Sequence, residues 1–143
     1  MKTLVIFYSY NGATRQLARQ LAEAEGADLY EVLDQKRPSL VGTFLRCPGA
    51  LRQASGKVQP IEVDFSAYER FIVMGPIWAS HPAPPVNNIL RALPKGSAVE
   101  LRMASAGGSS AKEKVTAFVQ ELGCTVADYQ DIATGKKPGA EAP

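Results

Sequence analysis

The chain has 143 residues, of which 45% are hydrophobic and 21% charged, and its formal net charge is +2. This length favours one domain with a core of its own, and the composition excludes a disordered chain. The small net charge gives no electrostatic reason to bind nucleic acid or an anionic membrane, so we expect neither partner.

The cysteines, the histidine and the lengths of the apolar runs further limit the class of protein. Cys47 and Cys124 lie far apart and His81 is the single histidine, so we expect free thiols and no metal site. The apolar run at 4–8 is shorter than the 7–15 residues of a signal-peptide core. No stretch approaches the roughly 20 apolar residues of a membrane span. These observations predict a cytoplasmic protein.

The first part of the chain alternates strand and helix patterns. Residues 4–8 form a continuous apolar run that is typical of a strand buried on both faces. After a polar loop, apolar residues recur at helical spacing up to Gly26, a natural helix end. Residues 29–33 predict a second strand. Helical pieces interrupted by Pro48 are expected within 38–57.

The second part continues the alternation. Residues 71–74 predict a strand that ends at Gly75-Pro76, and a helix follows over 86–93. Residues 98–104 predict a strand with one better-buried face. Ser110 and Glu113 form a capping-box pattern before a helix that ends at Gly123. A last strand is predicted at 125–132, and residues 134–143 are expected to form a mobile tail.

This alternation predicts an α/β fold, a three-layer α/β/α sandwich with a parallel sheet, over residues 1–133. In such sheets ligands bind outside the carboxyl ends of the strands, where the strand order reverses. The loops after the first, third and fourth strands are therefore the candidate site.

The first of these loops, 9–14, has the character of an anion site. It offers hydroxyls, a side-chain amide and backbone N–H groups beside a helix N-terminus, which favours a phosphate. Gly12 would let the backbone approach the anion or adopt a positive φ. The loop lacks Lys and Arg, and Arg15 lies just beyond it, so recognition by donors alone is predicted. The alternative is a plain turn with Thr14 as the N-cap.

The second loop, 75–85, contains Trp78 and four prolines. Prolines restrict the loop, and an indole at the mouth of the sheet can cover a flat aromatic ligand. The alternative places Trp78 in the core near the following helix. We expect His81 to be a surface residue rather than a proton donor.

The third loop, 105–110, consists of small residues that permit close approach of a ligand edge. Taken together, the three loops combine anion-binding character, an aromatic residue and space at one end of one sheet. That combination fits a phosphorylated molecule with a large planar ring.

The runs from Ile6 to Thr14 and from Val73 to Ala79 resemble the flavodoxin-like family, especially its short single-domain members. The resemblance extends over roughly residues 3–122. Ser9, Gly12 and Thr14 match the family's Ser-x-Thr-Gly-Asn-Thr pattern. In the second run, Gly75, Pro76 and Trp78 match the glycine, proline and tryptophan of the family's Gly-x-Pro-x-Trp pattern.

The resemblance implies a five-stranded parallel sheet of flavodoxin-like order 2-1-3-4-5 with FMN as the cofactor. It implies that the first loop holds the phosphate and that the other two loops flank the isoalloxazine ring. The implied cofactor-binding residues are Ser9, Tyr10, Asn11, Gly12, Ala13, Thr14, Pro76, Ile77, Trp78, Ala79, Ser105, Ala106, Gly107 and Gly108.

Two residues depart from the family pattern. Asn11 stands where the family usually has Thr, and Ala13 where it usually has Asn. One net hydrogen bond is worth about 0.5–1.5 kcal/mol, so its loss predicts an FMN affinity lowered by up to about tenfold.

The resemblance implies electron transfer by bound FMN, with a redox partner protein, and no side chain stands out as a catalytic acid or base. The mild net charge argues against docking to a strongly basic partner. The alternatives are an NAD(P)H-dependent FMN reductase or quinone-type oxidoreductase, or a flavin-free binding module on the same scaffold. Either a monomer or a homodimer is compatible with the sequence.

Overall fold

The computed structural model describes residues 2–10, 12–35, 56–78, 80–105 and 110–133. The predicted tail at 134–143 and most of the predicted helical stretch at 38–57 lie outside these ranges.

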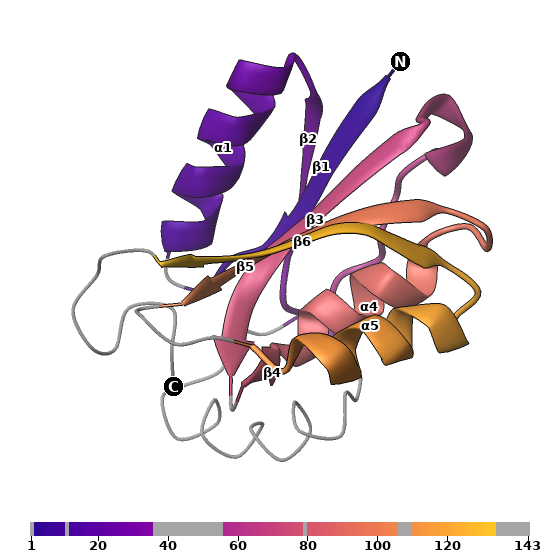
Figure 1. The fold of residues 1–143 in the computed structure, drawn as a ribbon. Coiled ribbons are helices and arrows are strands. Elements are labelled where there is room, and N and C mark those ends of the chain that lie inside the picture. Colours follow the sequence, from indigo (N-terminus) through magenta and orange to yellow (C-terminus); the bar gives the residue numbers. More distant parts are fainter. Residues whose placement is uncertain (1, 11, 36–55, 79, 106–109, 134–143) are drawn as a thin grey trace.

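A mostly parallel sheet forms the centre of the molecule (Figure 1). Its long strands are β1 (Thr3–Tyr8), β2 (Asp28–Val32), β3 (Arg70–Trp78), β5 (Ala98–Ser105) and β6 (Thr125–Ala133). They follow the order β2-β1-β3-β5-β6, and all neighbours on this path are parallel. The two-residue β4 (His81–Pro82) pairs antiparallel with the end of β3. If the short β4 is left out of the count, β5 and β6 are the fourth and fifth strands. The order is then 2-1-3-4-5, which confirms the expected sheet.

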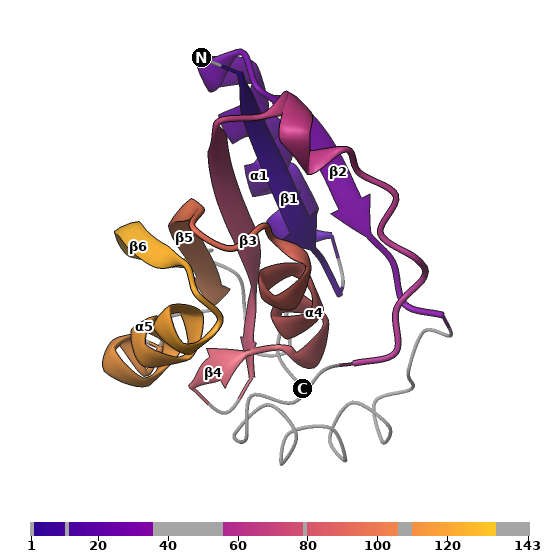
Figure 2. The same ribbon diagram turned by 90° about the vertical axis from the view of Figure 1, so that its right-hand side faces the viewer.

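Helices cover both faces of this sheet (Figure 2). One face carries α1 (Ala13–Glu25), and the other carries α4 (Pro84–Ala92) and α5 (Lys112–Glu121). A short 3-10 turn, η1 (Phe65–Ala67), precedes β3. The arrangement confirms the three-layer α/β/α sandwich. None of the described helices is long and apolar enough to cross a lipid bilayer.

Successive side chains of β1 point to opposite faces of the sheet and belong to two separate core clusters. Leu4, Ile6 and Tyr8 pack into the cluster beneath α4 and α5, whereas Val5 and Phe7 pack against α1. All five side chains are buried, as the continuous apolar run predicts. Full burial of a large apolar side chain contributes roughly 1.5–3 kcal/mol, so β1 stabilises both halves of the core, as does β3.

Gly75 lies inside β3 and not at its end. The strand continues through Pro76, which pairs with Ala104 of β5, as far as Trp78. The predicted strand end at Gly75-Pro76 is therefore wrong. The glycine is required for a packing reason: a Cβ at Gly75 would lie 2.1 Å from Cγ2 of Val86 on α4. The absence of a side chain lets α4 approach the sheet.

The N-terminus of α5 also differs from expectation. Its N-cap is Ala111, without a side-chain hydrogen bond, so the predicted capping box at Ser110 and Glu113 is wrong. Ser110 instead uses its N–H and its hydroxyl to bond Asp131 of β6, at 3.2 and 2.6 Å. Ser110 therefore bonds a residue of β6 instead of capping the helix that follows it. Near the other end of this helix Cys124 is a free, buried thiol, as expected, and Cys47 lies outside the described residues.

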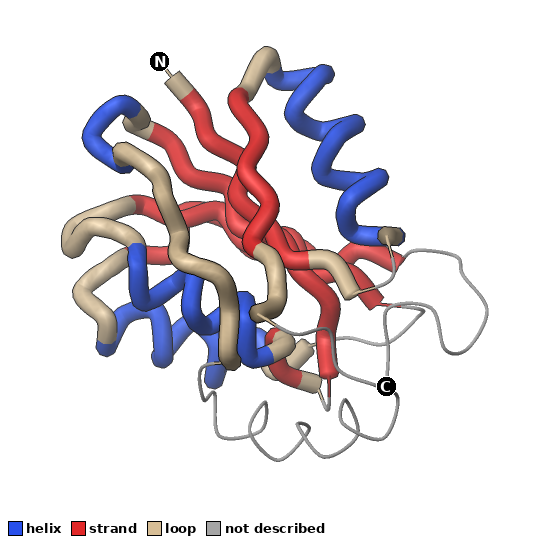
Figure 3. The backbone as a smooth tube through the Cα atoms, turned by 180° about the vertical axis from the view of Figure 1, so that it is seen from behind, coloured by secondary structure: helices blue, strands red, loops and turns tan. Residues whose placement is uncertain are grey.

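The segment 56–64 runs beside β2 and covers the edge of the sheet (Figure 3). The Gln59 N–H donates to Leu33 O at 2.8 Å, and the Gln35 N–H donates to Lys57 O at 3.1 Å. Asn88 of α4 fixes the start of the segment through both halves of its amide. Its Oδ1 accepts from Gly56 N at 2.7 Å, and its Nδ2 donates to Gly56 O at 3.0 Å.

We expect Asn88→Ala to lower the free energy of unfolding by about 1–2 kcal/mol, because both hydrogen bonds to a partly buried peptide group are lost. Urea denaturation measures the change. Asn88→Asp is a matched control that keeps the acceptor and loses the donor, so it should fall between the wild type and the alanine variant. Equal stability of all three proteins would show that the clamp contributes nothing.

A network of charged side chains lies on the α1 face of the sheet, beyond α1 itself. Arg70 bonds Glu100 through Nε and, at 2.9 Å, through Nη2, and it bonds Glu25 at 3.0 Å. Arg102 bonds Glu100 at 3.2 Å and Asp128 at 3.0 Å. Hydrogen bonds from Arg70, together with the charges of Arg70 and Arg102, hold the pKa of Glu100 below its usual range.

The lowered pKa of Glu100 predicts a pH dependence of stability. A carboxylate whose pKa is depressed on folding stabilises the protein above its unfolded pKa of about 4.3, and this stabilisation is lost as the pH falls through the folded pKa. We therefore expect the unfolding free energy of the wild type to fall below about pH 5 more steeply than that of Glu100→Gln. Urea titrations across this range test it, and identical slopes would contradict the network's role.

Candidate functional site at the carboxyl edge

The carboxyl edge is the end of the sheet at which β1, β3 and β5 finish. Because these strands are parallel neighbours, the residues that follow them emerge side by side. The segments after β3 and β5 are joined by a hydrogen bond from Ala111 N–H to Ser80 O at 2.7 Å. The strand ends from which the three predicted loops start therefore lie at one edge of one sheet.

The described residues of the first loop place a glycine with positive φ at the start of α1. Gly12 is the N-cap of α1 with φ 102°, so the expected positive φ is confirmed. Its N–H donates to Ser9 Oγ at 2.9 Å, and its carbonyl accepts from Gln16 N at 3.1 Å. Thr14 is buried in the first turn and is not the N-cap, so the alternative N-cap position of Thr14 is wrong. No acidic residue lies in this turn, and the helix dipole there favours an anion.

Arg15, the cation next to the first loop, forms an ion pair with Glu31 of β2. Its Nε donates to Oε1 at 2.9 Å, and its Nη2 to Oε2 at 2.5 Å, a bidentate pair. This pairing neutralises the cation nearest the loop. Recognition by backbone and hydroxyl donors alone stays a prediction.

The indole of Trp78 lies in the core, which is one of the two positions that the sequence left open. Trp78 is 0% exposed, and its ring meets Tyr8 and Tyr10 edge-on, with centroids 6.4 and 5.8 Å apart. Tyr10 and Ser9 are themselves largely buried. The aromatic side chains at this edge thus pack against one another and support the loop after β1.

We expect Trp78→Phe to lower the free energy of unfolding by about 1–3 kcal/mol, because it removes part of a fully buried ring. If the indole is a core residue, FMN affinity should change by less than about threefold, under 1 kcal/mol. Paired denaturation and FMN titration separate the two effects. A large loss of affinity with unchanged stability would instead assign the indole to the ligand.

The other predicted site residues are distributed as follows. Pro76 is buried, Ile77 and Ser105 are half-buried, and Ala13 is buried at the start of α1. Asn11, Ala79, Ala106, Gly107 and Gly108 lie outside the described residues. His81 is buried at 5% exposure in the β3–β4 hairpin, so its predicted surface position is wrong.

Next to the third loop, Ser110 connects to β6. Its hydroxyl shares a hydrogen bond with that of Tyr129 and donates to Asp131. Burial raises the pKa of Tyr129 to about 12, so its hydroxyl stays protonated at neutral pH. This cluster anchors the first turn of α5 against the sheet.

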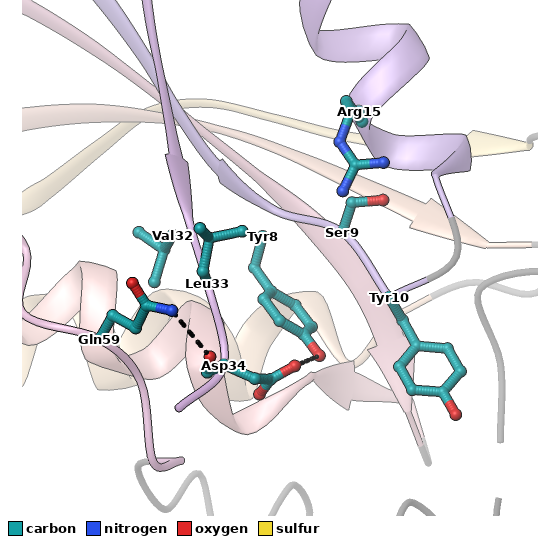
Figure 4. A pocket seen from close by; sticks show the side chains of 8 residues that line it. All are labelled: Tyr8, Ser9, Tyr10, Arg15, Val32, Leu33, Asp34 and Gln59. Atoms are coloured by element: carbon teal, nitrogen blue, oxygen red, sulfur yellow. Dashed lines mark hydrogen bonds between the residues drawn. The ribbon is translucent and has the colours of Figure 1, made fainter. Parts of the chain in front are cut away.

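On the β2 side of β1, the sequence predicts Ser9 and Tyr10 as site residues but not Asp34 or Gln59. A cavity of about 200 Å³ lies there, and Figure 4 shows the side chains around it. It is lined by Tyr8, Ser9, Tyr10, Arg15, Val32, Leu33, Asp34 and Gln59. Asp34 follows a predicted strand and could have been found from that signal. Gln59 comes from a segment whose path the sequence does not indicate.

The chain shares its fold with solved flavoprotein structures. It is 23% identical to the flavoprotein from Lactobacillus acidophilus NCFM solved in complex with FMN, with a TM-score of 0.73 over 91% of this chain and 92% of that one. It is 18% identical to a protein from Bacteroides eggerthii assigned as a flavoprotein, with a TM-score of 0.78 over 92% and 88%. No family model and no curated protein matches the sequence.

At these identities the likeness concerns the fold. The fold and the carboxyl edge define a doubly wound α/β protein with flavodoxin-like strand order, the fold expected from the sequence. A similar protein from Bacteroides uniformis, also assigned as a flavoprotein, is 19% identical with a TM-score of 0.73 over 92% of this chain and 91% of that one.

Proposed function

We propose that the chain binds FMN at the carboxyl edge and acts in electron transfer. The observation that carries the proposal is the start of α1: a positive-φ glycine, the Ser9 hydroxyl bonded to it and a first turn without acidic residues. The first turn of a helix carries N–H groups that make no bond within the helix, and these suit a phosphate. The phosphate of FMN fits this donor set.

In this proposal the isoalloxazine ring lies between the segments that follow β3 and β5. Half-buried Ile77 and Ser105 are available to contact it, together with the small residues predicted at 106–108. Trp78 would contribute through its backbone and through its support of Tyr10. FMN supplies the redox chemistry when bound, and the protein supplies binding, orientation and partial exclusion of water.

The fold comparison supports FMN over other phosphorylated ligands, because one similar structure is a complex with FMN. A titration of the protein with FMN, followed by quenching of flavin fluorescence, tests the proposal. We expect saturable one-to-one binding. Riboflavin, which lacks the phosphate, should bind at least about tenfold more weakly, because charge-assisted hydrogen bonds contribute about 1.5–3 kcal/mol. No saturation at about 100 μM FMN, where binding free energies of −5.5 kcal/mol are still detected, would overturn it.

The proposed electron transfer is tested separately from FMN binding. We expect chemically reduced, FMN-loaded protein to pass electrons to a soluble acceptor such as cytochrome c. NADH and NADPH should reduce the bound FMN no faster than they reduce free FMN. Rapid, stoichiometric oxidation of either nucleotide would instead favour the NAD(P)H-dependent reductase.

A further inference from the structure

A chain of hydrogen bonds joins the two segments between which the isoalloxazine ring is proposed to lie. Ala111, just before α5, donates its N–H to the carbonyl of Ser80, just after β3, at 2.7 Å. Figure 1 shows the short β4, which follows Ser80, close to the start of α5. The position of the segment after β5 relative to the segment after β3 therefore depends on what holds Ala111 and its neighbour Ser110.

Ser110 is fixed to β6 by two side chains. Its N–H and its hydroxyl both donate to Oδ1 of Asp131, at 3.2 and 2.6 Å. The Ser110 oxygen is also hydrogen-bonded to the Tyr129 hydroxyl, which is the donor because the serine proton goes to Asp131. Tyr129 belongs to the main core cluster and is 9% exposed, so it is a rigid support. These bonds fix the start of α5, and with it Ala111, relative to the sheet.

The acceptor at the other end of these bonds is held in an unusual conformation. Ser80 has φ 66°, and no other non-glycine residue in the described part of the chain has a positive φ. Such a conformation is unfavourable for a residue with a side chain and persists where surrounding contacts determine it. The bond from Ala111 is one such contact, and the pairing of Trp78 with His81 in the β3–β4 hairpin is another. Residues held in this way cluster at ligand sites.

The bonds from β6 act on one end of the proposed site. They reach the segments after β3 and β5, whereas the described part of the first loop is held by the bond from Gly12 N–H to Ser9 Oγ. They are therefore placed to affect the ring of a flavin and not its phosphate. We propose that Ser110 is a positioning residue, a role that rests on the proposed binding of FMN. It sets the separation of the two segments, and thereby the fit of the isoalloxazine ring and the exclusion of water from it.

The variant Ser110→Ala tests this role, with FMN and riboflavin as the two probes. It loses the hydroxyl and both of its hydrogen bonds, so we expect it to bind each flavin about three- to tenfold more weakly. Both affinities should fall by the same factor, because both molecules carry the isoalloxazine ring. The visible absorption band of the flavin at saturation should lose fine structure, since water then reaches the ring. A smaller folded fraction alone would leave the band of the bound flavin unchanged.

Two other serine variants are the matched controls. Ser110→Thr keeps a hydroxyl at the same position and should bind both flavins as the wild type does. Ser97→Ala removes a half-buried serine hydroxyl that donates to Pro94 O at 2.6 Å, before the opposite end of β5, and should also leave flavin binding unchanged. Asp131→Ala, which removes the acceptor on β6, should reproduce the effect of Ser110→Ala. If either of these alanine variants lost its cooperative unfolding transition, the other would decide.

The outcomes distinguish a failure of this role from a failure of FMN binding. If the wild type binds FMN, and Ser110→Ala and Asp131→Ala bind it equally well with an unchanged absorption band, the positioning role is overturned and the proposed function stands. A loss of FMN affinity without a loss of riboflavin affinity would also overturn the role, because the effect would then lie at the phosphate. Failure of the wild type itself to bind FMN would overturn both proposals.

Discussion

Gly75→Ala is expected to lower the free energy of unfolding by about 3 kcal/mol, at the upper end of what overpacking a core costs. The added Cβ would lie 2.1 Å from Cγ2 of Val86, a distance that requires either α4 or β3 to move. Val86 is fully buried and β-branched, so its side chain has little freedom to turn away. Urea denaturation at neutral pH measures the loss.

Two further variants identify the cause of that loss. In Gly75→Ala/Val86→Ala the clash is removed, so the double variant should be more stable than the sum of the two single changes predicts. Gly96→Ala tests backbone strain without a clash, because Gly96 has φ 88° and open space around it. It should cost only about 1–2 kcal/mol. A Gly75→Ala protein within 0.5 kcal/mol of the wild type would contradict the close approach of α4.

The second large effect is expected on FMN binding. Gly12→Asp should weaken it by at least about 100-fold, because the new carboxylate lies where the phosphate is proposed to bind and repels it. A Cβ at this position meets Arg15 Nη1 at 3.6 Å, an ordinary contact, and a side chain at φ 102° costs about 1–2 kcal/mol, a cost that a fold of ordinary stability survives. An acidic residue at a helix N-terminus even stabilises the helix. FMN fluorescence titration measures the affinity, and thermal unfolding verifies the fold.

Gly12→Asn is the matched control for this prediction. Asparagine has nearly the same size as aspartate and tolerates positive φ about as well, but it carries no charge. It should weaken FMN binding by less than about tenfold, so that the ratio between the two variants isolates the electrostatic effect. Equal FMN affinity of the aspartate variant and the wild type would mean that the phosphate binds elsewhere.

The sequence was sufficient to predict the centre of the fold because the strands β1 and β3 are buried on both faces. Such strands appear as continuous apolar runs, and β1 and β3 were found for this reason. Gly12 was found because a glycine between a strand and a helix has a specific backbone use, and its φ of 102° confirms it. The alternation of strands and helices then predicted a parallel α/β/α sandwich, and the resemblance to the flavodoxin-like family implied the order of its strands.

Tertiary contacts decided what the sequence could not. Gly75 was read as a strand end, whereas α4 requires a glycine there for close packing. Ser110 was read as a local cap, but Asp131 competes for its hydroxyl from β6. His81 was expected on the surface and is buried because the β4 hairpin folds back on β3. The cavity beside Asp34 depends on Gln59, which lies 25 residues further along the chain.

The central claim is that FMN binds at the carboxyl edge of β1, β3 and β5. Backbone ¹H–¹⁵N spectra of the labelled protein, recorded with and without FMN, test it most directly. We predict that the largest shift changes occur at residues 9–14, at Ile77 and at Ser105. The amino ends of the strands, such as Asp28, Ala98 and Thr125, should be unaffected. Shift changes confined to those amino ends, or none at saturating FMN, would contradict the account.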